Sequence, residues 1–181
     1  MKNPKQKGTD FELVIAKRLS RWYDPNSKID YFWRTHSSGA VATIRKSMCE
    51  VMEGDIMSIR EETHELFNYI VIECKRMRTL DLMSFLDRKA CDILSLYEVS
   101  RVKLSQNKFL LLVVKRDYGE ILVLTSLLLP KISKYMKINN NGHASLYLYK
   151  LEDMLSTYTF NEFLRNVKEE FTPDRSSLQV V

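Results

Sequence analysis

The 181-residue chain is poor in the residues that build disulfide scaffolds, linkers and membrane spans. Its three cysteines, Cys49, Cys74 and Cys91, have no CxxC spacing, which argues against zinc or a disulfide framework and favours a reducing compartment. Five glycines and four prolines are too few for long disordered linkers. The apolar runs within residues 109–114 and 121–130 are shorter than the roughly 18 residues of a membrane helix. The N-terminus also lacks a signal-peptide core. These absences predict a cytoplasmic protein without a membrane partner.

The charge balance is that of a globular domain with a mild basic excess. Twenty-eight Lys and Arg residues outnumber 23 Asp and Glu residues, and 45% of the chain is apolar. This excess suits a polyanionic partner, although charge alone does not identify one. There is no GxxxxGK[ST] phosphate loop and no Cys/His pair at nucleophile spacing. The sequence therefore indicates neither a nucleotide cofactor nor a thiol hydrolase.

Hydrophobic periodicity predicts an α/β domain with helices flanking a central sheet. The spacing predicts helices over residues 9–22, 81–104 and 161–171. Extended apolar patterns predict strands over residues 31–33, 54–59, 68–75, 107–117, 120–126 and 144–151. We expect the polar segment 60–67 to be a connection and residues 40–54 to form a loop.

The strand predicted over residues 68–75 ends in two opposite charges, Glu73 and Lys75. Strand side chains alternate between faces, so these two side chains point the same way. A surface ion pair of little energetic value is one interpretation. A second interpretation includes Asp55, which would lie beside Glu73 if residues 55–59 and 68–75 paired as a hairpin.

Two carboxylates held close together repel each other unless a cation lies between them. Hard carboxylate oxygens suit Mg²⁺ or Mn²⁺. The ammonium group of Lys75 beside them would orient a water molecule or stabilise developing negative charge. Such an arrangement has the parts that metal-assisted phosphodiester hydrolysis requires.

The order of these residues resembles the motif of the PD-(D/E)XK nuclease superfamily. Gly54-Asp55 and Ile72-Glu73-Cys74-Lys75 match it, with Gly54 in place of the motif's proline. Glu12 lies in the first helix, where many members carry an additional metal-binding glutamate. Residues 34–39, Arg-Thr-His-Ser-Ser-Gly, are similar to the R-x-x-x-S-G segment of archaeal Holliday junction resolvases. The resemblance covers about residues 8–125, and the loop after Ala40 is longer than the resolvase loop.

This resemblance implies a restriction-endonuclease-like fold and a DNA endonuclease that uses Mg²⁺, with Mn²⁺ as a substitute. It implies a nuclease core over about residues 8–125. The sequence pattern adds a strand and a helix at 145–171 and a frayed tail at 172–181, and we expect the whole chain, residues 1–181, to be one nuclease domain. A homodimer is implied as well, and twofold assemblies are common; a phage or mobile-element origin is one option. By resemblance, the metal ligands are Asp55, Glu73, the backbone carbonyl of Cys74, and Glu12. Lys75 would orient the attacking water, and Arg34 and Ser38 would contact the substrate phosphate or order the site.

Several interpretations stay open. Arg76 and Arg78 belong either to an ordinary solvated surface or to a phosphate contact beside the active centre. His36 is either structural or a substrate contact, and residues 31–33 are either core or a base-stacking platform. The function is structure-selective cutting of branched DNA, restriction- or repair-type cutting of duplex DNA, or DNA binding and assembly without cutting. The complete Asp55, Glu73 and Lys75 set favours the two nuclease functions.

Overall fold

The computed structural model describes residues 4–35, 53–77, 92–104, 107–117, 119–138 and 144–171. Most of the loop expected over residues 40–54 lies outside these ranges. The first part of the helix predicted over residues 81–104 and the tail at 172–181 also lie outside them. None of the described helices is long and apolar enough to cross a membrane.

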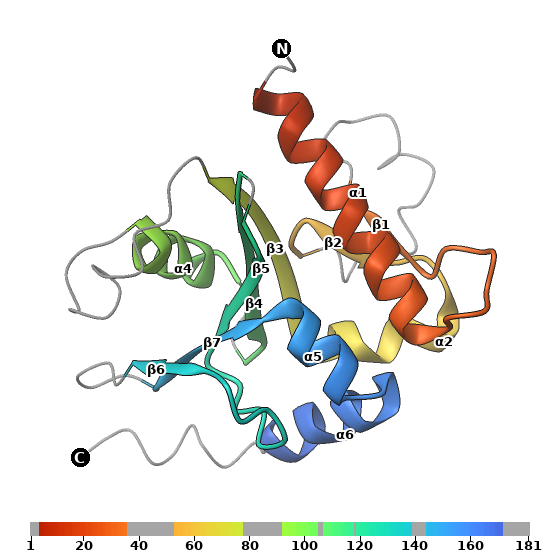
Figure 1. Ribbon diagram of the computed structural model, residues 1–181. Coiled ribbons are helices and arrows are strands. Elements are labelled where there is room, and N and C mark those ends of the chain that lie inside the picture. Colours follow the sequence, from red (N-terminus) through yellow and green to blue (C-terminus); the bar gives the residue numbers. More distant parts are fainter. Residues whose placement is uncertain are drawn as a thin grey trace.

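A five-stranded mixed sheet forms the centre of the fold, in the order β3-β4-β5-β7-β6 (Figure 1). β3 and β4 are parallel over eight residue pairs, and the other neighbours are antiparallel. The mixed central sheet predicted from the sequence is therefore confirmed. Its strands are β3 (Ile70–Met77), β4 (Phe109–Arg116), β5 (Ile121–Thr125), β6 (Met136–Ile138) and β7 (Leu146–Lys150).

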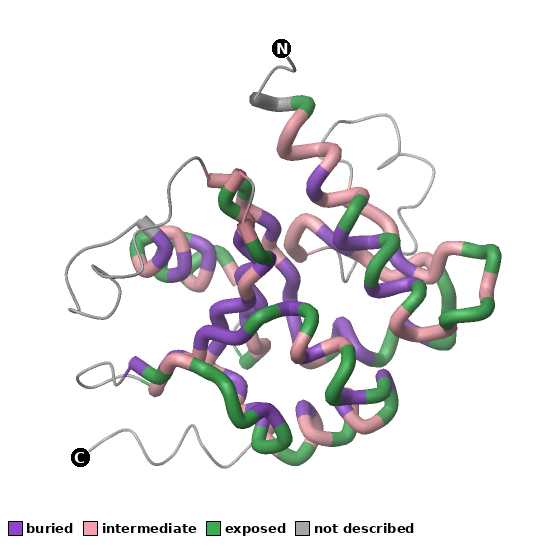
Figure 2. Tube along the Cα trace, in the orientation of Figure 1, coloured by how far each residue is buried: buried purple, intermediate pink, exposed green. Residues whose placement is uncertain are grey.

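Helices cover both faces of the sheet, because side-chain alternation along the strands gives each face its own apolar layer (Figure 1). Ile72 of β3 and Val113 of β4 belong to a cluster shared with α1, α5 and α6. Leu112 of β4 belongs to a second cluster, shared with α4. Buried residues follow the central strands in Figure 2. The helices are α1 (Pro4–Tyr23), α4 (Asp92–Val102), α5 (Leu151–Thr157) and α6 (Phe160–Glu170).

The predicted hairpin between residues 55–59 and 68–75 is wrong. β2 (Ile56–Ser58) instead pairs antiparallel with β1 (Phe32–Arg34), and these two strands form a separate small sheet. The segment still meets β3 just before β2 begins, where the Asp55 N–H donates to the Ile72 carbonyl at 2.8 Å. Gly54 precedes it with a φ of +87°, and a Cβ atom built there would lie 2.6 Å from the same carbonyl oxygen. Glycine at this position lets the chain touch β3 and then turn away to follow β1.

Four further elements differ from the sequence predictions. Residues 60–67 were expected to be a connection, but they form α2 (Glu61–His64) and most of the 3₁₀ turn η2 (Glu65–Asn68), because Leu66 and Phe67 insert into the core. β6 was not predicted, since three residues are too few to show an alternating pattern. α5 was also not predicted, since it begins directly after β7 without a turn signal.

Candidate active site

Asp55, Glu73 and Lys75 meet at the edge of the sheet formed by β3. The Lys75 Nζ atom lies 2.7 Å from Glu73 Oε2 and 3.1 Å from Asp55 Oδ2. All three side chains are partly exposed, between 20% and 35%. The expected proximity of the two carboxylates is therefore present, although it does not depend on the predicted hairpin. In this structure the cation between them is the Lys75 ammonium group.

The Asp55 carboxylate is fixed by the backbone of β3 as well as by Lys75. The Cys74 N–H donates to Asp55 Oδ2 at 2.8 Å. Thr35 holds the other side of the turn, because its hydroxyl donates to the Gly54 carbonyl at 2.7 Å and its N–H to the Asp55 carbonyl at 2.9 Å. Sequence reasoning gave Thr35 no role of its own. No short-range pattern connects it with Gly54, since the two residues are 19 positions apart.

Glu12 and Arg34 form a second charged pair beside this cluster. The Arg34 Nε–H donates to Glu12 Oε2 at 3.0 Å and joins α1 to β1. Burial, and then the negative charge of Asp55, raise the pKa of Glu12, while the Arg34 guanidinium lowers it in part. The structure therefore places Glu12 within the electrostatic influence of Asp55. It places Arg34 against Glu12, where the resemblance implied a contact with the substrate or a role in ordering the site.

The electrostatic surroundings keep Lys75 protonated. Burial alone would lower its pKa, but its hydrogen bond to Glu73 and the charges of Asp55 and Glu73 outweigh burial and raise the pKa. An ammonium group donates hydrogen bonds and cannot accept a proton, which excludes Lys75 as the general base in this arrangement. Burial, followed by the charge of Asp55, raises the pKa of the Cys74 thiol well above its ordinary value. The Cys74 thiol is therefore not a nucleophile at neutral pH.

Arg76 points to the other face of β3 from Glu73 and Lys75, because strand side chains alternate. Its Nε–H donates to Asp117 Oδ1 at 2.7 Å, and Lys7 of α1 lies 3.8 Å from the second Asp117 oxygen. Arg76 is thus engaged in an ion pair at the end of the strand. The predicted substrate residues Ser38 and Arg78, together with His36, lie outside the described residues.

No three His, Cys, Asp or Glu side chains among the described residues gather closely enough to hold a metal ion. Lys75 contacts one oxygen of Asp55 and one oxygen of Glu73, and Arg34 contacts one oxygen of Glu12. The donor chemistry nevertheless fits a divalent ion, since carboxylate oxygens are the ligands that Mg²⁺ and Mn²⁺ prefer. The predicted ligand set of Asp55, Glu73, Glu12 and the Cys74 carbonyl stays a prediction.

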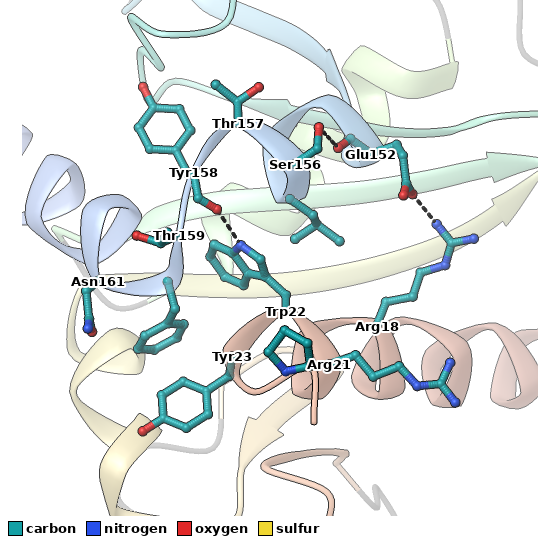
Figure 3. Close-up of a pocket in the computed structure, with 13 residues that line it drawn as sticks. Arg18, Arg21, Trp22, Tyr23, Glu152, Ser156, Thr157, Tyr158, Thr159 and Asn161 are labelled. Atoms are coloured by element: carbon teal, nitrogen blue, oxygen red, sulfur yellow. Dashed lines mark hydrogen bonds and ion pairs between the residues drawn. The ribbon is translucent and has the colours of Figure 1, made fainter. Parts of the chain in front are cut away.

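A cavity of about 860 Å³ lies elsewhere, between the C-terminal half of α1 and the junction of α5 with α6 (Figure 3). The Trp22 indole N–H donates to the Tyr158 carbonyl at 2.6 Å on one side of it, and Arg18 pairs with Glu152 at 2.8 Å on another (Figure 3). None of the carboxylates of the candidate site lines this cavity. Sequence reasoning did not anticipate it, because its walls come from segments about 130 positions apart.

The comparison with known families identifies a family that covers almost the whole chain. A family model described as "Phage putative PDDEXK endonuclease" matches residues 3–172, which extends well beyond the resemblance seen over residues 8–125. No curated protein and no solved structure matches the chain. The family match and the mixed sheet with flanking helices together show a restriction-endonuclease-like α/β fold. The chain therefore belongs to the phage PD-(D/E)XK endonuclease family and is a nuclease of the PD-(D/E)XK superfamily.

Proposed function

We propose that the protein is a Mg²⁺-dependent DNA endonuclease whose chemistry takes place at Asp55, Glu73 and Lys75. The observation that carries this proposal is the contact of one ammonium group with two carboxylates at the β3 edge, 2.7 and 3.1 Å away. Side chains from two segments that are 18 positions apart in sequence converge there. The same three residue types in the same order define the motif of the family.

In the proposed mechanism, Asp55, Glu73, Glu12 and the Cys74 carbonyl hold the divalent ion. A bound ion supplies Lewis-acid polarisation and positive charge beside the scissile phosphate. The Cys74 N–H holds the Asp55 carboxylate in one orientation, and the Arg34 Nε–H holds the Glu12 carboxylate of α1 beside β1. Both contacts reduce the rearrangement that the ligands need before they bind.

Lys75 has a different role, because it is protonated. Once released from Asp55, its ammonium group donates hydrogen bonds to the attacking water or to a non-bridging phosphate oxygen. The water oxygen forms a bond to phosphorus, one P–O ester bond breaks, and the leaving oxygen takes up a proton from solvent to become the hydroxyl end of the cut strand. Lys75 stabilises the negative charge that develops on the phosphate oxygens, while the proton lost by the water goes to solvent or to another acceptor.

The proposed substrate is branched DNA, and the proposed assembly is a homodimer. The similarity of residues 34–39 to the resolvase segment supports this choice over cutting of linear duplex. Paired cuts in two strands need two active sites, which a twofold dimer supplies. The pair with Asp117 uses the Arg76 Nε–H, so a phosphate contact by Arg76 would come from the other N–H groups of its guanidinium.

The decisive experiment incubates the purified protein with four-way junction, flap, single-stranded and linear duplex DNA, in Mg²⁺ or in EDTA. We expect Mg²⁺-dependent cleavage that falls by about 100-fold or more in Glu73→Ala. Glu120→Ala is the matched control, because Glu120 is an exposed carboxylate paired with Lys150. Cleavage that persists in Glu73→Ala would refute the assigned site. Equal cleavage of duplex and junction would remove the branch preference, and binding without any cleavage would support the assembly function instead.

A further inference from the structure

The sheet carries a second concentration of charge at the edge opposite β3. Residues 121–151 contain no Asp or Glu, although acidic residues make up 23 of the 181 positions in the chain. The same stretch contains the four lysines Lys131, Lys134, Lys137 and Lys150. It forms β5, β6 and β7, which are the strands farthest from β3 in the sheet order. The charged side chains of residues 121–151 are therefore all lysines, and this half of the sheet contributes only positive charge.

Three tyrosines gather on this part of the sheet. The Tyr135 ring centroid lies 5.7 Å from those of both Tyr147 and Tyr149, and the latter two rings are stacked at 6.1 Å. The Tyr149 hydroxyl accepts from the Leu129 N–H at 3.0 Å and is fixed inside the core. Tyr135 is outermost, with 42% of its surface exposed. Tyr147 and Tyr149 therefore support the Tyr135 ring, which is partly exposed to solvent.

Two of the lysines beside this ring carry charge that no carboxylate among the described residues neutralises. Lys131 and Lys150 are paired with Glu162 and Glu120. Lys134 and Lys137 are exposed and form no ion pair within the described part of the chain. The Lys137 Nζ atom instead lies 5.9 Å from the centroid of the Tyr147 ring. The two lysines flank Tyr135 in the sequence and are the cations of this edge that have no carboxylate partner among the described residues.

An exposed aromatic ring next to unneutralised lysines is the combination that binds single-stranded nucleic acid. The ring stacks on a base and the ammonium groups contact phosphates. Duplex DNA cannot offer a base face in this way, because its bases are stacked on each other. The charge also argues against a basic partner. These properties favour single-stranded nucleic acid as the ligand of the surface around Tyr135.

We propose that Tyr135, supported by Tyr147 and flanked by Lys134 and Lys137, binds single-stranded nucleic acid by base stacking and phosphate contact. Four strand spacings of about 4.8 Å separate β3 from β6, so the two edges of the sheet lie on the order of 20 Å apart. A substrate that reaches both sites has an unpaired segment at that distance from the cleaved phosphate. This last link rests on the proposed nuclease function, whereas the binding itself does not.

The test is fluorescence anisotropy in EDTA, which prevents cleavage, with a labelled oligothymidylate of about 20 nucleotides. We expect Tyr135→Ala to weaken binding by about 10-fold, because stacking on one aromatic ring contributes on that order. Tyr135→Phe keeps the ring and should bind like the wild type. Binding of a blunt duplex of equal length should not change in either variant.

A double variant, Lys134→Ala with Lys137→Ala, tests the phosphate contacts separately. The slope of log affinity against log salt should fall by about 1.4 for two contacts to a single strand. Lys28→Ala with Lys103→Ala removes two exposed charges elsewhere and should leave the slope unchanged. Circular dichroism melting checks that each variant is folded.

Wild-type affinity in Tyr135→Ala would overturn the proposal, and so would an equal loss of affinity for duplex and single strand. A salt slope that falls equally in both double variants would overturn the phosphate contacts. Failure of the nuclease function would appear differently, as intact binding without cleavage of any substrate in Mg²⁺.

Discussion

The two edges of the central sheet use charge in opposite ways. At β3, carboxylates and cations lie in short contacts, with Lys75 between Asp55 and Glu73 and Arg34 on Glu12. At β6, Lys134 and Lys137 form no ion pair among the described residues. Chemistry on one phosphate needs side chains that are held in place, whereas binding along a strand needs cations that remain available to phosphates. The contrast fits the two proposals, with catalysis at the β3 edge and nucleic-acid binding at the β6 edge.

The largest expected effect follows from removing the bridging ammonium group at β3. Lys75→Met should lower the cleavage rate by about 100-fold or more, because no donor then stabilises charge on the phosphate. The same variant should bind Mn²⁺ more tightly, because the lysine no longer competes for the oxygens of Asp55 and Glu73. Single-turnover cleavage and isothermal titration measure the two effects. A rate within threefold of the wild type would remove Lys75 from the chemistry.

The next effect concerns the turn that brings Asp55 to β3. Gly54→Ala should lower the free energy of unfolding by about 3 kcal/mol, because φ is +87° and the new Cβ atom would lie 2.6 Å from the Ile72 carbonyl oxygen. Urea denaturation measures this change. Gly8→Ala is the matched control, since nothing lies within 4 Å of its Cβ position in α1. That substitution should raise stability by about 0.5–1 kcal/mol, and equal effects at the two glycines would contradict the close approach.

A smaller effect is expected at Thr35, which acts on the site through the Gly54 carbonyl. Thr35→Val removes the hydroxyl but keeps the shape, and it should cost about 1 kcal/mol of stability. Cleavage should fall by about 10-fold at limiting Mg²⁺ and recover partly at high Mg²⁺, because Asp55 is less well positioned. Thr35→Ser should restore both properties. If stability falls while the Mg²⁺ dependence stays the same, Thr35 is only structural.

The smallest effect is a pH dependence that originates at Glu12. Its pKa is raised above 4.5, so the folded state holds this proton more tightly than the unfolded state. That contribution favours folding at low pH and is lost as pH rises through the raised pKa. The stability of Glu12→Gln relative to the wild type should therefore improve between about pH 4 and pH 7. Urea midpoints across this range measure the trend, and a constant difference would contradict it.

Lys75 has a different pH window. Its pKa is raised above 10.5, so its pairing stabilises the folded state fully below that pH and is lost only as pH rises through the raised value. Stability changes between about pH 4 and pH 7 are therefore not attributable to Lys75.

Strand alternation was enough to predict that Glu73 and Lys75 share a face, because this property depends on two neighbouring residues. The proximity of Asp55 was also predicted, although through a hairpin that does not form. The contact of Arg34 with Glu12 was not predicted, since it depends on how α1 packs against β1. Thr35 was missed for the same reason. Local periodicity contains no information about such tertiary contacts.

The secondary structure also divides into elements that local periodicity predicts and elements that depend on tertiary packing. Long periodic segments such as α1 and β4 were predicted, since each has enough apolar residues to define a period. β6 and α5 have three and seven residues, and tertiary packing decides their structure. η2 formed where a polar sequence suggested a connection, because Leu66 and Phe67 are buried against the core. These short elements therefore could not be predicted from the sequence pattern and were found only in the structure.

β6 has a consequence for how copies of the protein behave at high concentration. It is the last strand in the sheet order, so one row of its backbone groups faces away from the sheet. Exposed strand edges invite pairing between molecules, and short length and lysine are two features that oppose it. β6 has only three residues, and its middle residue is Lys137. The same lysine that attracts a polyanion thus keeps neighbouring molecules apart, and its removal should make the protein more prone to aggregate.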